Sequence, residues 1–475
     1  MVELTDCDAT SLSALIGQGI VAPSEVMAAT LARIGAVNPA VNAIVSLRDG
    51  DAMMAEAVAA DDAPRKGWLH GIPLAVKDLA DAEGLPTTQG SPLFAGKVAA
   101  RDDLMVARLR NAGAIIIGKT NTPEFGLGSH SFNPVFGVTR NPFDLTRSAG
   151  GSSGGAGAAL ATGMVSVADG SDMMGSLRNP AAWNNVYGMR PTWALVPPEP
   201  EGEMFLHQLS TLGPMARTPR DIARLLGTMS GPDPMQPHGR PTFEPGRARP
   251  ARPQRIGWLR DWGGAYAMEA GLLDCAAAAV TRLAGLGHRV EPVAPPFAAE
   301  GLWESWITLR SWAVAGSLAG LEIGALKPEA VWEVERGLAL SAAEVQRASL
   351  VRSAWFRAAA RLFETFDALV LPATQVWPFP AGWRWPREIA GRAMDSYHRW
   401  MEVVVPASLI GLPCICLPCG TGPSGLPHGL QLIGPRDGDG GLIAIAQEWE
   451  EARPAQERRV VTPGPVPPGL TDGPA

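Results

Sequence analysis

The sequence predicts an α/β fold, in which short buried strands alternate with helices. Three apolar runs, "GIPLAVKD", "AGAIIIGKTN" and "MVSVADGS", are separated by segments that read as helices. The same alternation returns near the middle of the chain, where the run "RIGWLRDW" precedes the helical stretch "MEAGLLDCAAAAVTRLAGLG". A chain of 475 residues is long enough to bury a large core around such elements.

The elements can be assigned in order along the chain. Residues 1–60 have apolar side chains at helical spacing and predict outer helices, with Ser24 as an N-cap before Glu25. A stretch rich in Pro and Gly, residues 230–254, predicts a surface connection. After it we expect a strand at "RIGWLRDW", a helix that ends at Gly287 and another strand at "HRVEPV".

The last third of the chain predicts three further regions. Residues 300–400 read as helical and are rich in tryptophan, and part of this region is predicted to form a cleft. Residues 403–435 contain no Asp, Glu, Lys or Arg but repeated Pro and Gly, which favours buried strands and tight turns over a membrane helix. Residues 461–475 are predicted to be a disordered tail.

Charge and cysteine content exclude several classes of protein. The chain has 40 basic and 47 acidic residues, a net charge of −7, and so lacks the basic excess that nucleic-acid binding requires. Five cysteines make a disulfide framework improbable, and the C-x-C-x-x-C group at Cys414, Cys416 and Cys419 lies in an apolar run, so we expect no metal there. The N-terminus has neither a basic nor an apolar segment of the secretory kind, which predicts a cytoplasmic protein.

The segment "GSSGG" fits the G-x-S-x-G pattern of a nucleophile elbow through Ser153. A hydrolase of that kind also needs a late histidine, for which His398 and His428 are the candidates. The same serines and glycines are equally typical of a loop that begins a helix. The pattern alone therefore leaves both interpretations open.

A second candidate nucleophile is Ser176, in "GSDMMGSLR" at the predicted start of a helix. Backbone N–H groups at such a turn have no partner inside the helix and can stabilise an oxyanion. A third feature is Lys77, at the end of the apolar run "GIPLAVKD". Its amine either reaches solvent or is held inside without charge, as a general base must be.

Taken together, these segments resemble the amidase signature hydrolases. The motifs "GIPLAVKD", "GAIIIGKTNTPEF", "FGVTRNP", "GGSSGGAGAALATG" and "GSDMMGSLRNPAA" occur in the order that this family shows. The resemblance implies one α/β domain over residues 61–460, with core motifs at 69–200 and a mixed central β-sheet covered by helices on both faces. It also implies an enzyme that acts on non-peptide carbon–nitrogen bonds.

The resemblance further implies a Ser–Ser–Lys relay as the catalytic set. The family's lysine falls on Lys77, its bridging serine, which follows a cis peptide bond, falls on Ser152, and its acylated serine falls on Ser176. The implied oxyanion donors are the backbone N–H groups of Met173, Met174, Gly175 and Ser176. Supporting roles fall on Ser153, Asp172 and Arg178, with Asp78 beside the relay. Arg178 could instead bind an anion.

One departure from the family pattern concerns the oxyanion loop. The family usually has two glycines before the nucleophile, whereas this chain has Met174 and Gly175. A side chain at 174 restricts the backbone and is expected to narrow the acyl pocket.

Neutral Lys77 requires a pKa lowered by about three units, which burial can impose, so activity is expected to rise toward alkaline pH.

The implied chemistry needs no cofactor and takes a small-molecule amide or carbamate, with no nucleic-acid or membrane partner. The many tryptophans favour a hydrophobic or aryl amide. Three alternatives stay open: a urethanase with the same relay, the glutaminase subunit of a tRNA-dependent amidotransferase, and a noncatalytic binding protein that keeps the fold. The sequence also leaves a homodimer open.

Overall fold

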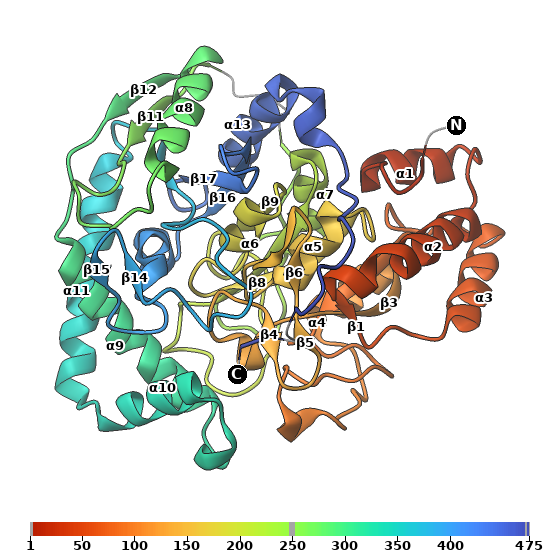
Figure 1. The fold of residues 1–475 in the computed structure, drawn as a ribbon, viewed down its shortest axis with the longest axis horizontal. Helices are drawn as coiled ribbons and strands as arrows, with labels where there is room; N and C mark the ends of the chain where they lie inside the picture. The colour runs from red at the N-terminus through yellow and green to blue at the C-terminus, as the bar shows by residue number, and fades with distance from the viewer. Residues whose placement is uncertain (1–2, 247–251, 471–472, 475) are drawn as a thin grey trace.

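The computed structural model describes residues 3–246, 252–470 and 473–474. It has the predicted α/β architecture, with a mixed sheet through the middle and helices packed around it (Figure 1). Within the described residues, none of the helices combines the length and apolar character needed to span a bilayer.

The N-terminal segment forms helices on the outside of the molecule (Figure 1). They are α1 (Ala9–Gly17), α2 (Pro23–Val41) and α3 (Gly50–Asp61). The predicted cap at Ser24 is wrong, because α2 begins at Pro23 with Ala22 as the N-cap, two residues earlier than predicted. The carboxylate of Glu25 accepts a hydrogen bond from Ala22 N, and Ser24 instead bonds Asp61 through both its N and its Oγ.

A small sheet carries the first core motifs. Its strands are β1 (Ile44–Val45), β2 (Pro73–Lys77) and β3 (Ile115–Thr120), in the order β1-β3-β2. Strands β2 and β3 are parallel, and β1 is antiparallel to β3. Around these strands lie α4 (Leu104–Asn111) and the short helices η1 (Pro92–Phe94) and η2 (Glu124–Gly126).

A larger sheet of eight strands has the order β12-β11-β13-β17-β16-β9-β10-β8. Its strands are β8 (Val167–Asp172), β9 (Tyr187–Arg190), β10 (Thr211–Ala216), β11 (Arg255–Trp258), β12 (Arg289–Pro292), β13 (Ala368–Pro372), β16 (Cys414–Thr421) and β17 (Pro427–Ile433). Strand β11 is parallel to β12 and β13, and the other pairs are antiparallel. The backbone N of Lys77 donates to Asp169 Oδ1 at 3.0 Å, which connects β2 with β8.

Alternate residues along the strands enter two different hydrophobic clusters. In β13, Leu369 and Leu371 pack in one cluster while Ala368 and Val370 pack in the other. Strand β16 alternates in the same way, with Cys414 and Cys416 on one side and Ile415 and Leu417 on the other. Because side chains alternate across a strand, each face of the sheet is covered by its own core. The predicted sheet with helices on both faces is confirmed.

The helices that cover the sheet come from all parts of the chain. They include α5 (Gly154–Ala161), α6 (Arg178–Trp183), α7 (Pro219–Met229), α8 (Leu272–Gly285), α9 (Ala299–Ser317), α10 (Pro328–Ala339), α11 (Ala342–Leu362), α12 (Val405–Leu409) and α13 (Asp439–Ala452). Short helices lie at η3 (Ile323–Ala325), η4 (Arg399–Val404) and η5 (Ala455–Arg458), and short strands at β4 (Phe132–Asn133), β5 (Gly137–Val138), β6 (Arg140–Asn141), β7 (Asp144–Ser148), β14 (Glu388–Ile389) and β15 (Arg392–Ala393).

The region 300–400 is helical only in its first part. Helices α9, α10 and α11 run from Ala299 to Leu362, but the sheet strand β13 follows them. The stretch 403–435 begins with helices η4 and α12 before its two predicted strands, β16 and β17. Apolar runs of this length fit a buried helix as well as a strand, so composition could not separate the two.

Two predicted segments fall partly outside the described residues. Residues 247–251 of the predicted connection lie outside them, as do residues 471, 472 and 475 of the predicted tail. Val461, at the start of that tail, donates a backbone hydrogen bond to Ala161 O at 2.8 Å.

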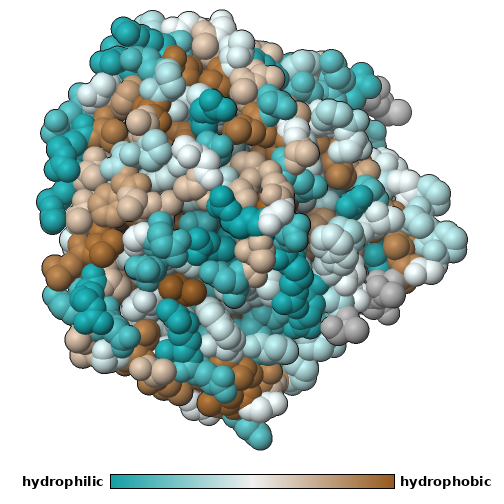
Figure 2. All heavy atoms as spheres, turned by 60° about the vertical axis from the view of Figure 1, so that its left-hand side comes forward, coloured by the Kyte–Doolittle hydropathy of each residue, from teal (hydrophilic) through white to brown (hydrophobic). Residues whose placement is uncertain are grey.

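On the face drawn in Figure 2, hydrophobic residues form separate patches between hydrophilic ones.

Candidate active site

Lys77 ends strand β2 with its side chain buried, at 1% exposure. Its amine lies among three hydroxyl groups: Nζ is 2.7 Å from Ser152 Oγ, 2.9 Å from Ser153 Oγ and 3.1 Å from Ser171 Oγ. A buried ammonium would need a carboxylate close by, whereas a neutral amine is satisfied by hydroxyls. The arrangement therefore favours the uncharged amine.

Burial lowers the pKa of Lys77 to about 7, against the opposing effect of Asp169 and then Asp172. Burial also raises the pKa of Asp169 to about 6, against the opposing effects of the hydrogen bond from Lys77 N and of the charge of Lys77. Both shifts come from the exclusion of water between β2 and β8. A substantial fraction of the amine is thus neutral at physiological pH.

Ser152 and Ser153 lie in the loop between β7 and α5, and the Gly151–Ser152 peptide bond is cis. The loop is held from both sides, because Ser129 Oγ donates to Gly151 O at 2.5 Å and Ser153 N donates to Ser176 O at 3.2 Å. This second bond joins the loop directly to the segment that carries the other predicted serine.

Ser176 lies between β8 and α6, and it lines the same cavity as Ser152. The hydrogen bonds of the described residues connect Lys77 with Ser152 but do not extend to the Ser176 hydroxyl. Such bonds are often loose without substrate and tighten in the reacting complex. Of the predicted set, the structure brings Lys77 and Ser152 into contact and places Ser176 in the cavity that Ser152 also lines.

The predicted oxyanion donors are not equivalent. Gly175 N donates to Asp172 Oδ1 at 2.8 Å, so this group is already engaged. The N–H groups of Met173, Met174 and Ser176 have no hydrogen-bond acceptor in the described part of the chain. These three are the groups that remain for an oxyanion.

The methionine at position 174 is accommodated by an ordinary backbone. The residue with positive φ in this turn is Gly175, at +80°, where an added Cβ would also lie 2.8 Å from Asn179 Oδ1. Met174 is 2% exposed and lines the cavity together with Met173. The glycine that the turn requires is therefore present, and Met174 forms part of the pocket wall.

Asp172 and Arg178 hold the turn that carries Ser176 in place. Asp172 accepts from Gly175 N, Leu177 N and both Arg178 Nε and Nη2. Burial alone would raise the pKa of Asp172, but Arg178, and then Arg190, hold it well below its ordinary value. Arg178 is completely buried and also bonds Gln431 Oε1 at 2.8 Å. It does not line the cavity, so bracing is the role that its contacts support.

Asp78 belongs to a second buried group beside the relay. Its carboxylate accepts from Thr88 N at 3.1 Å and lies 3.9 Å from Lys119 Nζ. Burial raises the pKa of Asp78 and lowers that of Lys119. These contacts hold the strand ends of β2 and β3 together next to Lys77.

The nucleophile-elbow interpretation does not fit the structure. Ser153 Oγ contacts the amine of Lys77, whereas His398 packs against Trp303 and His428 against Trp377, with ring centroids 5.1 and 5.7 Å apart. Neither histidine contacts Ser153 in the described residues. The pattern fails because G-x-S-x-G specifies a turn and not the partners that meet it.

The cavity that holds the two serines has a volume of about 120 Å³. Its apolar lining comes from Leu79, Phe125, Leu127, Met173, Met174, Val314 and Met401. Helix α9 contributes Arg310, Val314 and Ser317 to this wall, but no tryptophan among the described residues lines it. Indoles such as Trp306 and Trp400 are instead fully packed in the core.

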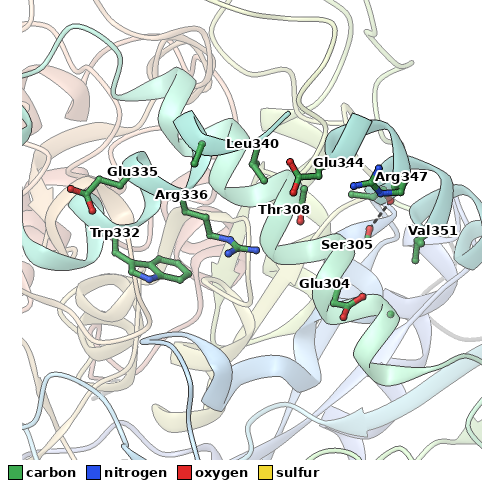
Figure 3. A pocket seen from close by; sticks show the side chains of 13 residues that line it. Glu304, Ser305, Thr308, Trp332, Glu335, Arg336, Leu340, Glu344, Arg347 and Val351 are labelled. Carbon is green, nitrogen blue, oxygen red and sulfur yellow. Dashed lines mark hydrogen bonds between the residues drawn. The ribbon is translucent and has the colours of Figure 1, made fainter. Parts of the chain in front are cut away.

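A larger cavity of about 810 Å³ lies between α9, α10 and α11, where Trp332 and Arg336 face Thr308 and Glu304 (Figure 3). It contains none of the predicted catalytic residues.

Within the described residues no group of His, Cys, Asp and Glu side chains is arranged to hold a metal ion. Cys414 and Cys416 are buried side chains of β16.

Sequence reasoning missed three residues of this site. Asp169 and Ser171 contact Lys77, and both lie in the motif region around Ser176, so their position in β8 was a usable signal. Arg310 lines the cavity from α9 and carried no such signal, because only the packing of α9 against the nucleophile turn brings it there.

The comparisons with known proteins agree with this geometry. A family model described as Amidase matches residues 25–443. A glutamyl-tRNA(Gln) amidotransferase subunit from Salinispora arenicola is 34% identical and aligns over 95% of this chain and 98% of its own length. An acylamidase of Rhodococcus erythropolis is 30% identical over 95% of this chain and 96% of its own.

A solved structure gives the same result. The crystal structure of a bacterial aryl acylamidase of the amidase signature family superposes with a TM-score of 0.89 and 27% sequence identity, covering 97% of this chain and 99% of that one. Motif order, sheet architecture, family match and superposition thus agree. This chain belongs to the amidase signature family, whose members are hydrolases that act on carbon–nitrogen bonds.

Proposed function

We propose that this chain is a serine amidohydrolase that cleaves a hydrophobic or aryl amide through an acyl-enzyme formed on Ser176. The observation that carries the proposal is the buried amine of Lys77, with a pKa of about 7, at 2.7 Å from Ser152 Oγ in the cavity that Ser176 also lines. A base at this pKa is suited to proton transfer at neutral pH.

In the first half of the reaction, neutral Lys77 accepts the proton of Ser152, which in turn accepts the proton of Ser176. The Ser176 oxygen then forms a bond to the carbonyl carbon, and the carbonyl electron pair moves onto oxygen. The free N–H groups of Met173, Met174 and Ser176 stabilise this oxyanion. Loss of one such donor typically costs about 3–4 kcal/mol of transition-state stabilisation.

In the second half, the carbonyl reforms and the carbon–nitrogen bond breaks. The leaving nitrogen takes a proton back through Ser152 from the Lys77 ammonium. A water molecule, deprotonated by the same relay, attacks the Ser176 ester and releases the acid. Each step uses only groups of the chain and water.

The lining of the cavity supports an apolar substrate. Seven apolar side chains surround the serines, and Arg310 is the one charged side chain among the lining residues described. Five serines also line the cavity, and apolar walls with a limited number of placed polar groups are typical of a site for a small organic molecule. Two of the similar proteins are named acylamidases, which agrees with this substrate class. A carbamate presents the same carbonyl and leaving nitrogen and remains the close competitor.

A glutaminase subunit is the second candidate, because relatives of nearly the same length are named as subunits of a glutamyl-tRNA(Gln) amidotransferase. Glutamine, however, has an α-ammonium group that calls for a carboxylate in the pocket. None of the described residues that line the cavity is Asp or Glu. The lining therefore favours the free-standing amidohydrolase.

The nucleophile can be tested by intact mass after treatment with a fluorophosphonate. Wild-type protein is expected to gain one adduct, and Ser176→Ala none, with hydrolysis reduced by about three orders of magnitude or more. Ser317→Ala is the matched control, since its hydroxyl lines the same cavity but donates to Val314 O at 3.0 Å. An adduct that persists in Ser176→Ala overturns the assignment.

The substrate class is tested with an aryl amide, a carbamate of the same amine, and glutamine. Turnover of the amide above the carbamate supports the proposal, and the reverse supports the urethanase. Hydrolysis of glutamine alone, strengthened by a co-purifying partner chain, supports the second candidate and overturns the first.

A further inference from the structure

Arg310 is a buried guanidinium that reaches the catalytic cavity. It lies on α9 at 3% exposure and is part of the lining that includes Ser152 and Ser176. Nε donates to Glu333 Oε1 at 2.6 Å and Nη2 donates to Tyr397 OH at 2.8 Å. These two bonds hold the guanidinium in a fixed position.

The third guanidinium nitrogen of Arg310, Nη1, lacks a strong hydrogen-bond acceptor in the described part of the chain. Nη1 has one described partner, the thioether sulfur of Met173, at 3.3 Å. A thioether is a weak acceptor, and each guanidinium Nη carries two N–H groups. A charged donor beside an apolar cavity is costly unless an oxygen completes its hydrogen bonds. Met173 belongs to the oxyanion turn, so Nη1 points toward the region that the substrate occupies.

The charge of Arg310 is already balanced. Glu333 accepts from Arg310, from Tyr397 OH at 2.8 Å and from Ser311 Oγ at 2.7 Å. Burial opposes ionisation of Glu333, but Arg310 reverses this and keeps its pKa below the ordinary value. A substrate carboxylate would add an uncompensated negative charge in a buried site, whereas a neutral carbonyl oxygen would not.

Building on the proposed function, we propose that Arg310 is a specificity-determining residue that binds a second, neutral carbonyl oxygen of the substrate, separate from the carbonyl that Ser176 attacks. The alternative is a purely structural ion pair between α9 and α10. That alternative accounts for Nε and Nη2, which face Glu333 and Tyr397. It does not account for Nη1 at the cavity wall.

The inference is tested with matched anilides whose substituent differs at one place: a methylene, a ketone in its position, or a carboxylate ending a chain of the same length. Chain length is varied by one carbon at a time, and a second series carries the substituent on the amine. Wild-type kcat/KM is expected to favour the ketone over the methylene by about 10- to 100-fold at one chain length, since a hydrogen bond to a charged donor is lost without it.

Arg310→Met alone would leave Glu333 buried without its partner and could prevent folding. The informative variant is therefore the charge-balanced pair Arg310→Met with Glu333→Gln, in which the ketone preference should fall towards one. Glu333→Gln alone keeps Arg310 but removes its counter-charge, and should shift the preference from ketone to carboxylate. Fluorophosphonate titration of Ser176 in each variant gives the concentration of folded sites.

The outcomes separate the two proposals. A wild-type enzyme that hydrolyses the anilides without preferring the ketone overturns the role of Arg310 and leaves the proposed function intact. A preference for the carboxylate in wild type overturns the neutral class. A ketone preference that survives in the double variant assigns it to other residues. No turnover together with no labelling of Ser176 overturns the proposed function itself.

Discussion

At the scale of single residues, the surroundings of Lys77 decide whether the site can work at neutral pH. Three hydroxyls contact its amine, while Asp169 reaches the backbone N of the same residue. Hydroxyls can donate to a neutral amine or accept from an ammonium, so these contacts are compatible with either protonation state of Lys77. Carboxylates in contact with Nζ would hold the proton in place. Contacts with serines and not with acids therefore leave the amine able to act as the proposed base.

This arrangement predicts a rise of kcat/KM with pH. Burial lowers the pKa of Lys77 to about 7, and only the unprotonated amine can accept the proton of Ser152. Activity should therefore be low below pH 7, increase through it and level off above it. The profile is measured with an anilide from mildly acid to mildly alkaline pH. Lys77→Arg, which stays protonated, should lose about 10²- to 10⁴-fold and show no such rise. A wild-type profile that is flat across this range would contradict the assignment of the base.

The residues of the site differed in how far the sequence could predict them. Lys77, Ser152 and Ser176 lie in motifs whose order identified the family. The structure places Ser152 and Ser176 in the lining of one cavity, with Lys77 Nζ hydrogen-bonded to Ser152. Arg310 is 134 positions beyond Ser176 in numbering and lies in a helix without a motif. Its approach to Met173 depends on how α9 packs, which no local pattern encodes.

At the scale of elements, helix α5 explains much of the glycine in "GGSSGGAGAALATG". The sequence indicated a loop that begins a helix here, and two of the glycines serve the packing of that helix. A Cβ on Gly155 would lie 2.3 Å from Asn121 N and 2.6 Å from Ala43 O, and one on Gly157 would lie 2.8 Å from the Asn184 amide. Helix α5 thus packs against backbone atoms at Gly155 and against the Asn184 side chain at Gly157, with no room for a side chain at either position. The contact fixes the start of the helix, where Ser152 and Ser153 lie.

The close packing of α5 predicts opposite effects for two Gly→Ala substitutions. Gly155→Ala is expected to lower the free energy of unfolding by about 2–3 kcal/mol, because its contacts are backbone atoms that cannot move aside. Gly35→Ala, in the exposed middle of α2 with nothing within 4 Å of the added Cβ, should raise it by about 0.5–1 kcal/mol. Urea unfolding followed by tryptophan fluorescence measures both. Equal effects would show that α5 does not depend on this contact.

Elements were predicted well where their pattern was local. The strands at Pro73–Lys77, Ile115–Thr120 and Val167–Asp172 coincide with the three apolar runs that predicted the fold class. The mixed sheet covered on both faces was implied by the family resemblance, and the order of its strands was not predicted, because periodicity gives faces but not neighbours. Helix α12 was missed because its buried sequence has no polar side to mark a helical period.

At the scale of the whole molecule, Asp172 and Arg178 connect the turn between β8 and α6, which carries Ser176, with the C-terminal half of the chain. Arg178 bonds Asp172 on one side and Ser408 Oγ and Gln431 Oε1 on the other, at 2.6 and 2.8 Å. Arg190, from β9, adds a second positive charge at 3.4 Å from Asp172 Oδ1. The position of Ser176 is therefore tied to strands and helices more than 200 residues away in sequence.

Removing the charge of Asp172 should destabilise the entire fold. In Asp172→Asn two buried guanidinium groups lose their counter-charge, and the free energy of unfolding is expected to fall by about 3–5 kcal/mol. Glu201→Gln is the control for loss of an ion pair in solvent, since Arg101 and Glu201 are 59% and 69% exposed. It should change stability by less than about 1 kcal/mol. Urea unfolding at neutral pH compares the three proteins.

The cluster of Asp172, Arg178 and Arg190 also determines how the stability difference between wild type and Asp172→Asn depends on pH. Since the folded protein holds the pKa of Asp172 well below its ordinary value, the stabilisation is fully present above the pKa of an unfolded Asp, about 4, and is lost as the pH falls below it. The gap between wild type and Asp172→Asn should therefore be constant from neutral pH to about pH 5 and shrink in stronger acid. A gap that stays constant into strong acid, or a variant as stable as wild type at neutral pH, would mean that the charge of Asp172 does not hold the two halves together. In that case the bond network of Arg178 to Ser408 and Gln431 would have to stabilise the turn without it.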